Sequence, residues 1–265
     1  MTDRHSDSSR LLVLHGNGDQ EAVLPAAIQS LSSSVPSPRI SVVEVGDGPL
    51  PNLRHHALLN RQSLVAWHVN HPRGRHPKLH AYPRGLRLAP LWDILLANSS
   101  LQTRHARPRL LLCSCFSPSR PGRLQKMHAL IANGFACAPH TRECGVRRTS
   151  YAELLLQSKF VFSPRGLGHQ NHRDWEALLA GSVPLVDDDE GLAPMWDSLP
   201  VVRVRNWSAV TQDRLDWIWQ RMHVAKQNLS WTKVYLPYWL DRLLHAPAAA
   251  EATRHQRPPS EFIIE

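Results

Sequence analysis

The chain has 265 residues, enough for one large or two moderate domains, and its 42% hydrophobic and 20% charged residues are typical of a globular protein. Lys and Arg outnumber Asp and Glu by 31 to 22, which gives a formal net charge of +9 and favours an anionic partner. Because the arginines are scattered and no nucleic-acid-binding motif occurs, we expect a small anionic ligand and no nucleic acid.

Compartment signals are sparse in the sequence. No apolar run approaches the roughly 20 residues of a membrane span, so no transmembrane segment is expected. The opening MTDRHSDSSR is polar and lacks the apolar core of a signal peptide. This pattern indicates a soluble chain without a targeting signal, or a piece of a longer protein. Asn98, Asn206 and Asn228 each begin an Asn-x-Ser tripeptide, which matters only in a secreted setting.

The four cysteines have neither the spacing of a zinc site nor the density of a disulfide scaffold. Cys113 and Cys115 stand two residues apart in the apolar run LLLCSCF, on one face of a predicted buried strand. We therefore interpret the cysteines, which include Cys137 and Cys144, as core residues.

The amino-terminal half alternates short apolar runs with helical patterns. Residues 1–9 predict a disordered tail. Apolar runs bounded by turn residues predict strands at 11–15, 40–48, 63–69 and 78–82. Helical spacing predicts helices at 22–34, 55–60 and 91–101. The rest of 71–86 is rich in Pro and basic residues and predicts an irregular loop.

The alternation restarts after residue 108. Strands are predicted at 109–116, 135–139, 159–164, 183–186 and 201–207. Helices are predicted at 122–134, where Gly134 stops the helix, and at 150–158, 172–181, 191–199, 210–228 and 238–245. Residues 246–265 form a low-complexity tail without an assigned structure.

Strands that alternate with helices predict an α/β fold with parallel sheets. The two runs predict two Rossmann-like domains, a short amino-terminal one at 10–108 and a second at 109–245. Ligands of such sheets lie at the carboxyl ends of the strands. The loop 163–171 follows a predicted strand and precedes a predicted helix, so we expect it to lie at a binding crevice.

The helix after this loop has a clear start. Asn171 is a good N-cap, and Asp174, three residues later, resembles the acid of a capping box. Trp175, Leu178 and Leu179 fall on one side of the helix and are expected in the core.

Another side of the same helix predicts an anion site. His172 and Arg173 add positive charge to a helix start that is already positive, which costs stability unless an anion compensates. Gly166 and Gly168 allow close approach of a ligand to free backbone N–H groups. Glu176 lies one turn further on, where a carboxylate can accept hydrogen bonds from ribose hydroxyls. The alternative is a capped surface helix whose His and Arg are solvated, and Gly-x-Gly alone lacks a dinucleotide fingerprint.

The segment KFVFSPRGLGHQNHRDWEALLAGSVPLV resembles the signature of exostosin-like glycosyltransferases. That signature is Ser-Pro-x-Gly-x-Gly, then His-Arg-x-Trp-Glu-Ala-Leu, then Gly-x-x-Pro. The resemblance extends more weakly over residues 40–240. The matching residues are Ser163, Pro164, Arg165, Gly166, Gly168, His172, Arg173, Trp175, Glu176, Ala177, Leu178, Gly181 and Pro184.

The resemblance implies a GT-B arrangement, in which two Rossmann-like domains face each other and the second holds a nucleotide-sugar, here a UDP-sugar. It implies that Arg165 and Arg173 face the diphosphate, that His172 lies beside it and that Glu176 holds the ribose. The acceptor would be a glycan or another hydroxyl compound. No metal or other cofactor is expected, because basic groups and helix amides stabilise the departing diphosphate in such enzymes. We interpret the acidic run 187–190 as a solvated loop.

Two points stay open at the level of the sequence. The family often has Asp where this chain has Gln170, which cannot carry charge. A catalytically inactive nucleotide-sugar- or carbohydrate-binding protein of the same fold is therefore the alternative. The resemblance also implies the Golgi lumen if the chain is a fragment of an anchored family member, and the cytoplasm otherwise.

An inverting transfer needs a general base from the amino-terminal domain. Asp47, in a Gly-Asp-Gly turn after a predicted strand, is the catalytic candidate, although a plain turn aspartate fits the pattern too. His15 and Asp19 flank another strand end. Lys78 and Arg84 in the basic loop are further candidates to meet an anion.

Overall fold

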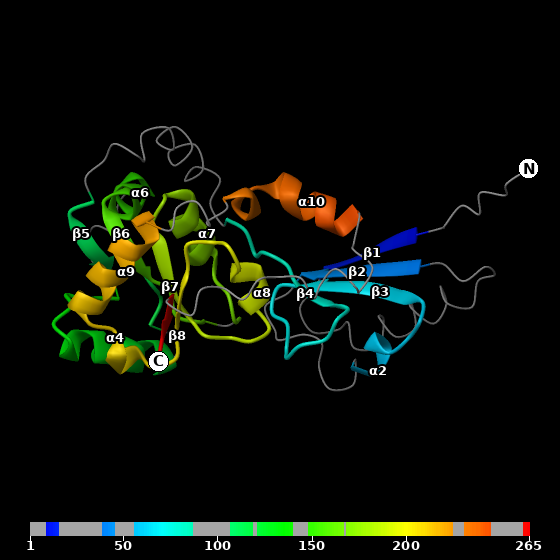
Figure 1. Cartoon of the computed structure of the whole chain (residues 1–265), viewed down its shortest axis with the longest axis horizontal. Helices are drawn as coiled ribbons and strands as arrows, with labels where there is room; N and C mark the ends of the chain where they lie inside the picture. Colours follow the sequence, from blue (N-terminus) through cyan, green and yellow to red (C-terminus); the bar gives the residue numbers. More distant parts are fainter. Residues whose placement is uncertain are drawn as a thin grey trace, which may run out of the picture. The chain divides into compact units, whose positions relative to one another are not determined.

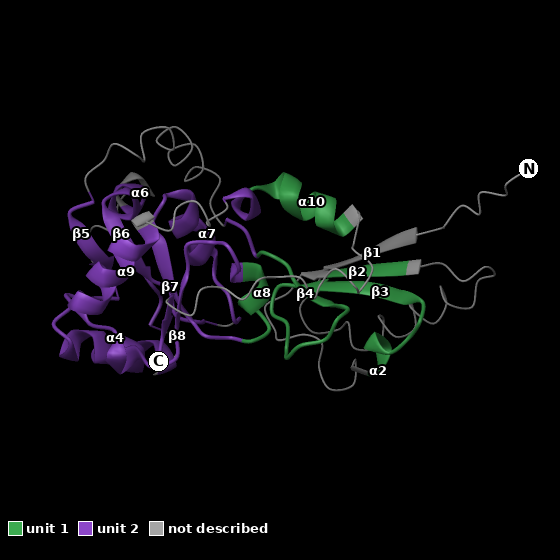
Figure 2. Ribbon diagram, viewed as in Figure 1, with its two compact units in different colours: residues 1–83, 190–195, 235–256 green, residues 84–189, 196–234, 257–265 purple. Residues whose placement is uncertain are grey.

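The computed structural model describes residues 9–15, 39–45, 56–86, 107–118, 121–139, 148–166, 168–224, 231–244 and 262–265. The chain forms two compact units (Figure 2). Unit 1 comprises residues 1–83, 190–195 and 235–256, and unit 2 comprises residues 84–189, 196–234 and 257–265. The domain boundary predicted after residue 108 stays a prediction, because residues 87–106 lie outside the described part. Within that part, no helix has the length and apolar character needed to cross a membrane.

Unit 1 is built on a parallel sheet of four strands in the order β1-β2-β3-β4 (Figure 1). The strands are β1 (Ser9–His15), β2 (Arg39–Val45), β3 (Leu64–Val69) and β4 (Leu79–Ala81). The apolar runs predicted as strands here are therefore strands.

The core of unit 1 lies where helix α2 (His56–Leu59) packs against this sheet. Apolar side chains from α2 and from the two strands β2 and β3 form one buried cluster: Ile40, Val42, Leu58, Leu59, Leu64, Trp67 and Val69. Trp67 is fully buried, and burial of a side chain of that size removes a large apolar area from water.

Unit 2 is built on a second parallel sheet, of five strands in the order β5-β6-β7-β8-β9 (Figure 1). The strands are β5 (Arg109–Leu112), β6 (Ser158–Phe162), β7 (Val183–Asp187), β8 (Val202–Val204) and β9 (Ile263–Ile264). Two parallel sheets with intervening helices confirm the predicted α/β class.

Successive residues of the unit 2 strands serve two cores, because side chains alternate between the faces of a sheet. Phe160 and Phe162 of β6 belong to a cluster with residues of α4 (Pro121–Ala132) and α9 (Gln212–Val224). Val161, between them, belongs to a cluster with α6 (Arg148–Leu156) and α7 (His172–Leu179). Helices therefore cover both faces, as expected for buried parallel strands.

The remaining described helices are short or lie late in the chain. They are α8 (Ala193–Trp196) and α10 (Leu236–Leu244), with single 3-10 turns η1 (Trp207–Ala209) and η3 (Thr232–Val234). Gly134 follows the end of α4 with a φ of +83°, a left-handed conformation that glycine adopts without strain, as the helix-stop prediction requires. The helix predicted at 22–34 and the helix predicted at 91–101 lie outside the described residues.

The predicted strand at 135–139 is wrong. These residues run beside the end of β5, where the N–H of Ala138 donates to the carbonyl of Cys113 and that of Phe116 to the carbonyl of Pro139. The strand predicted at 109–116 ends at Leu112, before Cys115, whose φ of 61° is left-handed and cannot continue an extended strand.

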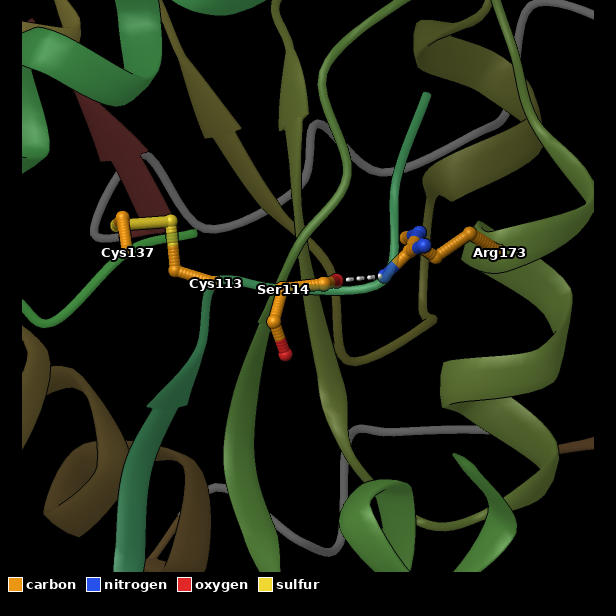
Figure 3. Close-up of a disulfide and its surroundings, with 4 residues drawn as sticks. All are labelled: Cys113, Ser114, Cys137 and Arg173. Carbon is orange, nitrogen blue, oxygen red and sulfur yellow. Dashed lines mark hydrogen bonds between the residues drawn. A yellow bond between two sulfur atoms is a disulfide. The ribbon is translucent and has the colours of Figure 1, made fainter. Parts of the chain in front are cut away.

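The interpretation of the cysteines as core residues is confirmed for Cys113, which is 1% exposed, but it missed that the described cysteines are disulfide-bonded. Cys113 and Cys137 form a disulfide across 24 residues of sequence, and Cys115 is disulfide-bonded as well. The bond joins the end of β5 to the segment that runs beside it (Figure 3).

Part of the segment predicted as a low-complexity tail is ordered structure. Residues 262–265 place β9 beside β8, and Phe262 and Ile264 are buried in the core of unit 2, at 6% and 2% exposure.

Candidate functional site

The start of α7 is built as the sequence predicts. Asn171 is the N-cap with extended backbone angles, and its N–H donates to the Asp174 carboxylate at 2.7 Å. The Ser163 hydroxyl, at the end of β6, donates to the other oxygen of Asp174 at 2.5 Å. Burial raises the pKa of Asp174 to about 7, against the opposing effect of these hydrogen bonds. Both ends of the loop between β6 and α7 are thus hydrogen-bonded to one buried carboxyl group.

The predicted core face of α7 is confirmed. Trp175, Leu178 and Leu179 are buried, and the ring of Trp175 packs 5.5 Å from that of Trp196. This face of α7 is therefore fixed in the core of unit 2.

Gln170 is a structural residue. It is 1% exposed, and its side-chain oxygen accepts hydrogen bonds from the indole N–H of Trp175 and the backbone N–H of Arg84, both at 2.9 Å. Both donors need only an acceptor oxygen, which an amide supplies as well as a carboxylate does. The neutral side chain at this position is therefore adequate for these two hydrogen bonds.

His172 is a neutral imidazole in this arrangement. The Nε–H of Arg84 donates to Nε2 of His172 at 3.0 Å, so Nε2 must accept. The hydrogen is then on Nδ1, which donates to the carbonyl of Gly85 at 2.8 Å. These two hydrogen bonds fit an uncharged ring, so they do not support the positive charge expected on His172, which stays a prediction. The cations at this point are Arg173 and, from a distant segment, Arg84.

Arg173 crosses from α7 to the end of β5. Its guanidinium donates to the carbonyl of Ser114 at 2.8 Å (Figure 3) and lies 5.4 Å from the ring centroid of Tyr151. Among the described residues, no carboxylate forms an ion pair with it. An arginine held by a carbonyl and an aromatic ring keeps its charge available for an anion.

Glu176 lies one turn further along α7, as predicted, and is only 6% exposed. Its Oε2 accepts a hydrogen bond from the Tyr151 hydroxyl at 3.0 Å. Burial raises the pKa of Tyr151, and Glu176 adds to the effect, so the phenol keeps its proton and remains a donor. Within the described part of the chain, Oε1 of Glu176 accepts no hydrogen bond. That oxygen can accept one from a ligand.

The loop that contains Gly166 and Gly168 differs in part from the prediction that its backbone N–H groups are free. The N–H of Gly166 is not free, because it donates to the carbonyl of Gly168 at 3.1 Å. A side chain at Gly166 would clash with the guanidinium of Arg123, whose central carbon would lie 2.9 Å from the added atom. Glycine at this position therefore makes room for an arginine of α4.

Arg165 holds the loop by its backbone and leaves its side chain exposed. Its N–H donates to Asp187 at 2.7 Å, and its carbonyl accepts from Nε of Arg123 at 3.1 Å. Its guanidinium contacts no carboxylate among the described residues. Near the start of α7, Arg165 and Arg173 thus each carry a positive charge that no carboxylate of the described part of the chain pairs with.

Two basic residues of α4 belong to the site and were missed. Arg123 donates to the side-chain oxygen of Asn171 at 2.8 Å, and Lys126 pairs with Asp187 at 2.6 Å. The sequence signal that could have found them is the one used for α7, namely basic residues near the start of a helix. The first turns of α4 carry cations and no acidic residue. Arg123 and Lys126 differ from Arg165 and Arg173 because their side chains already bind the loop and the end of β7.

The interpretation of residues 187–190 as a solvated loop is wrong for the three aspartates. The side chains of Asp187, Asp188 and Asp189 are 15%, 12% and 19% exposed, whereas that of Glu190 is 81% exposed. Asp187 is the last residue of β7 and accepts from the indole of Trp207 at 2.8 Å, in addition to its bond with Lys126.

The next two aspartates are also paired. Asp188 contacts Arg203 at 3.3 Å and Arg205 at 2.7 Å, and Asp189 contacts Nδ1 of His169 at 2.6 Å. Asp187 and Asp189 therefore fasten both ends of the glycine segment of the loop. The acidic run is a scaffold for the loop that precedes α7.

Most of the candidate site residues of unit 1 lie outside the described part of the structure. Asp47 and Asp19, and the side chain of His15, lie outside the described residues. Lys78 is used locally, because its ammonium donates to the carbonyl of Arg61 at 2.6 Å. The structure thus brings Arg165, Gly166, Gly168, His172, Arg173 and Glu176 together on one loop and helix, and adds Arg84 to them.

No group of three His, Cys, Asp or Glu side chains suited to a metal ion occurs within the described ranges. Comparison with known protein families and with characterised proteins gives no match.

Proposed function

We propose that the chain is a glycosyltransferase that moves a sugar from a nucleotide diphosphate-sugar to a glycan or another hydroxyl acceptor. The observation that carries the proposal is that two arginine side chains and one carboxylate oxygen, all near the carboxyl end of β6, are available to a ligand. Among the described residues, Arg165 and Arg173 have no carboxylate partner, and one oxygen of Glu176 accepts no hydrogen bond. Two cations suit a diphosphate, and a buried carboxylate one turn deeper suits ribose hydroxyls.

The chemistry of this proposal is a substitution at the anomeric carbon of the donor sugar. The acceptor oxygen forms a bond to that carbon, and the bond between the carbon and the diphosphate oxygen breaks. Arg165 and Arg173 stabilise the charge that grows on the departing diphosphate. The acceptor proton passes to a base, for which Asp47 of unit 1 is the candidate.

The neutral state of His172 has a consequence for this role. His172 orients Arg84 through the hydrogen bond to its Nε, so Arg84 is fixed beside the first turn of α7. The guanidinium of Arg84 adds a third positive charge at this end of the helix, which offsets the loss of the charge expected on His172 itself.

Resemblance to exostosin-like glycosyltransferases extends the proposal. It supports a GT-B arrangement, with unit 2 as the donor domain and unit 1 as the acceptor domain, and a UDP-sugar as the donor without a metal ion. For the location, it supports the Golgi lumen if the chain is a fragment of an anchored family member, and the cytoplasm otherwise. A catalytically inactive nucleotide-sugar-binding protein of the same fold is the alternative, and the experiment distinguishes the two.

The test combines a donor panel with two readouts. Release of nucleotide diphosphate from UDP- and GDP-sugars reports catalysis, and a thermal shift with the same compounds reports binding. Release of UDP from one sugar supports the glycosyltransferase. A thermal shift without release supports the binding protein, and neither response contradicts both.

Glu176→Ala tests the ribose contact. Loss of a hydrogen bond to a charged group costs about 1.5–3 kcal/mol, so we expect UDP to bind about 10- to 100-fold more weakly. Glu153→Ala, an exposed glutamate on α6, is the matched control and is expected to bind normally. An unchanged affinity of Glu176→Ala for UDP would contradict the proposal that Glu176 binds the ribose.

A further inference from the structure

One motif of the sequence is not used by the proposed function, namely the tripeptide Asn206-Trp207-Ser208. The other two tripeptides of this kind, at Asn98 and Asn228, lie outside the described residues. The tripeptide begins two residues after the end of β8, and Asn206 is the N-cap of η1. Its local structure can therefore be compared with what an N-glycan acceptor needs.

The side-chain amide of Asn206 is exposed, and the fold uses its oxygen but not its nitrogen among the described residues. The side-chain oxygen of Asn206 accepts the N–H of Ser208 at 3.0 Å, which is an Asx-turn. Its Nδ2 donates no hydrogen bond to a described residue, and Asn206 and Ser208 are both exposed. A sugar on Nδ2 would therefore displace no hydrogen bond to the described part of the chain.

The residue between them anchors the turn. Trp207 is 6% exposed, packs 5.1 Å from the ring of Phe162, and donates its indole N–H to Asp187. The carbonyl of Ser208 also accepts a hydrogen bond from the side-chain amide of Asn133 at 2.8 Å. The buried Trp207 holds the turn while the two residues required for modification remain at the surface.

A second observation concerns the compartment. Cys113 is bonded to Cys137, Cys115 is also disulfide-bonded, and the described cysteines include no free thiol. Disulfides persist in oxidising compartments and are rare in the cytosol. In eukaryotic cells the compartment in which disulfides form also adds glycans to Asn-x-Ser/Thr in surface loops.

We propose that Asn206 is an N-glycosylation site, modified in the same oxidising compartment in which the disulfides form. The donor class is a lipid-linked diphosphate oligosaccharide. Nδ2 of Asn206 loses a proton and forms a bond to the anomeric carbon of the first sugar, while the bond from that carbon to the lipid diphosphate breaks and the lipid diphosphate leaves. The proposal is independent of nucleotide binding.

The test is peptide mapping of the full chain, produced in eukaryotic cells behind a cleavable secretion leader. Trypsin cuts after Arg205 and Arg214, so the peptide 206–214 contains one asparagine. Enzymatic removal of N-glycans in heavy-oxygen water converts a glycosylated asparagine to aspartate that carries the label. We expect the label at residue 206 in most of the secreted chain and in the cell-retained fraction that has entered the pathway.

Three variants separate modification from folding. Ser208→Ala removes the required hydroxyl but keeps the backbone N–H that bonds to Asn206, so the turn should remain folded while the label disappears. Ser208→Thr should keep the label, and Asn206→Gln should lose it. An unlabelled 206–214 peptide in the secreted wild type would overturn the proposal, as would alkylation of Cys113 and Cys137 as free thiols in the secreted chain.

Discussion

The hydroxyl of Tyr151 donates a hydrogen bond to Glu176 at 3.0 Å, and its ring lies 5.4 Å from the guanidinium carbon of Arg173. One side chain of α6 thus contacts the two residues of α7 that we assign to the ribose and to the diphosphate. The two contacts use different parts of Tyr151, so they can be removed separately.

Tyr151→Phe removes the hydroxyl and keeps the ring. We expect UDP to bind about five- to tenfold more weakly, because Glu176 loses a hydrogen bond of roughly 1 kcal/mol that orients it. Inorganic pyrophosphate, which lacks a ribose, should bind as it does to the wild type. Calorimetric titration with both compounds checks this. An equal loss for both would indicate a general disturbance of α7 instead of an effect on Glu176.

His68 makes the stability of unit 1 depend on pH. Burial lowers its pKa from 6.5 to about 3, and the nearby His80 and Arg242 contribute in the same direction. The unfolded chain then binds more protons between these two values, so stability is full above pH 6.5 and falls as the pH falls toward 3. At pH 4.5 the loss amounts to roughly 2–3 kcal/mol relative to pH 7.5.

The variant His68→Leu isolates this effect. Nε2 of His68 has no hydrogen-bond partner among the described residues, so an apolar side chain of similar size should be tolerated at neutral pH. Urea unfolding at pH 7.5 and 4.5 should show a smaller loss on acidification for His68→Leu than for the wild type. The same loss in both proteins would show that other groups cause the acid dependence.

Arg107 connects three segments of unit 2 through its guanidinium. It donates to the carbonyls of Leu155, Ser158 and Ala180 and to the hydroxyl of Ser182, at 2.6–3.3 Å. Burial lowers its pKa to about 10, so it remains charged at neutral pH.

Replacement of Arg107 by Ala removes the donor that the carbonyl of Ala180 has among the described residues. The hydroxyl of Ser182 can still donate to one of the carbonyls of Leu155 and Ser158, so one or two acceptors lose their donor. An unsatisfied buried polar group costs about 1–3 kcal/mol, so we expect a loss of about 2–4 kcal/mol in the free energy of unfolding. Arg109→Ala, which removes an arginine of β5 with no such contacts, should cost less than about 1 kcal/mol. Similar losses for the two variants in chemical denaturation would argue against the role of Arg107.

Local patterns predicted the parts of the site that are close in sequence. The strand, loop and helix from 158 to 179 follow from an apolar run, a glycine pair and an N-cap, each of which acts over a few residues. Arg84, Arg123 and Tyr151 reach the same helix from segments far away in sequence. Their contacts depend on how strands and helices pack, and no periodicity of a single sequence records that.

The strand errors have a related physical origin. Residues 135–139 have the apolar composition of a strand, but they are tied to the end of β5 by a disulfide and two hydrogen bonds and do not enter the ladder. The two-residue strand β9 is too short for any alternation to be read. It is defined by its pairing with β8 and by burial of Phe262 and Ile264.

The Cys113–Cys137 disulfide is expected to support both stability and the site. The bond closes a loop of about 25 residues, for which the chain-entropy estimate is about 3 kcal/mol. Cys113 also precedes Ser114, whose carbonyl holds Arg173 (Figure 3). Cys113→Ala with Cys137→Ala should therefore lower the free energy of unfolding by about 2–4 kcal/mol and weaken pyrophosphate binding. The measurements are denaturant unfolding and calorimetric titration. If stability falls while pyrophosphate binds as before, the carbonyl of Ser114 does not depend on the disulfide for its position.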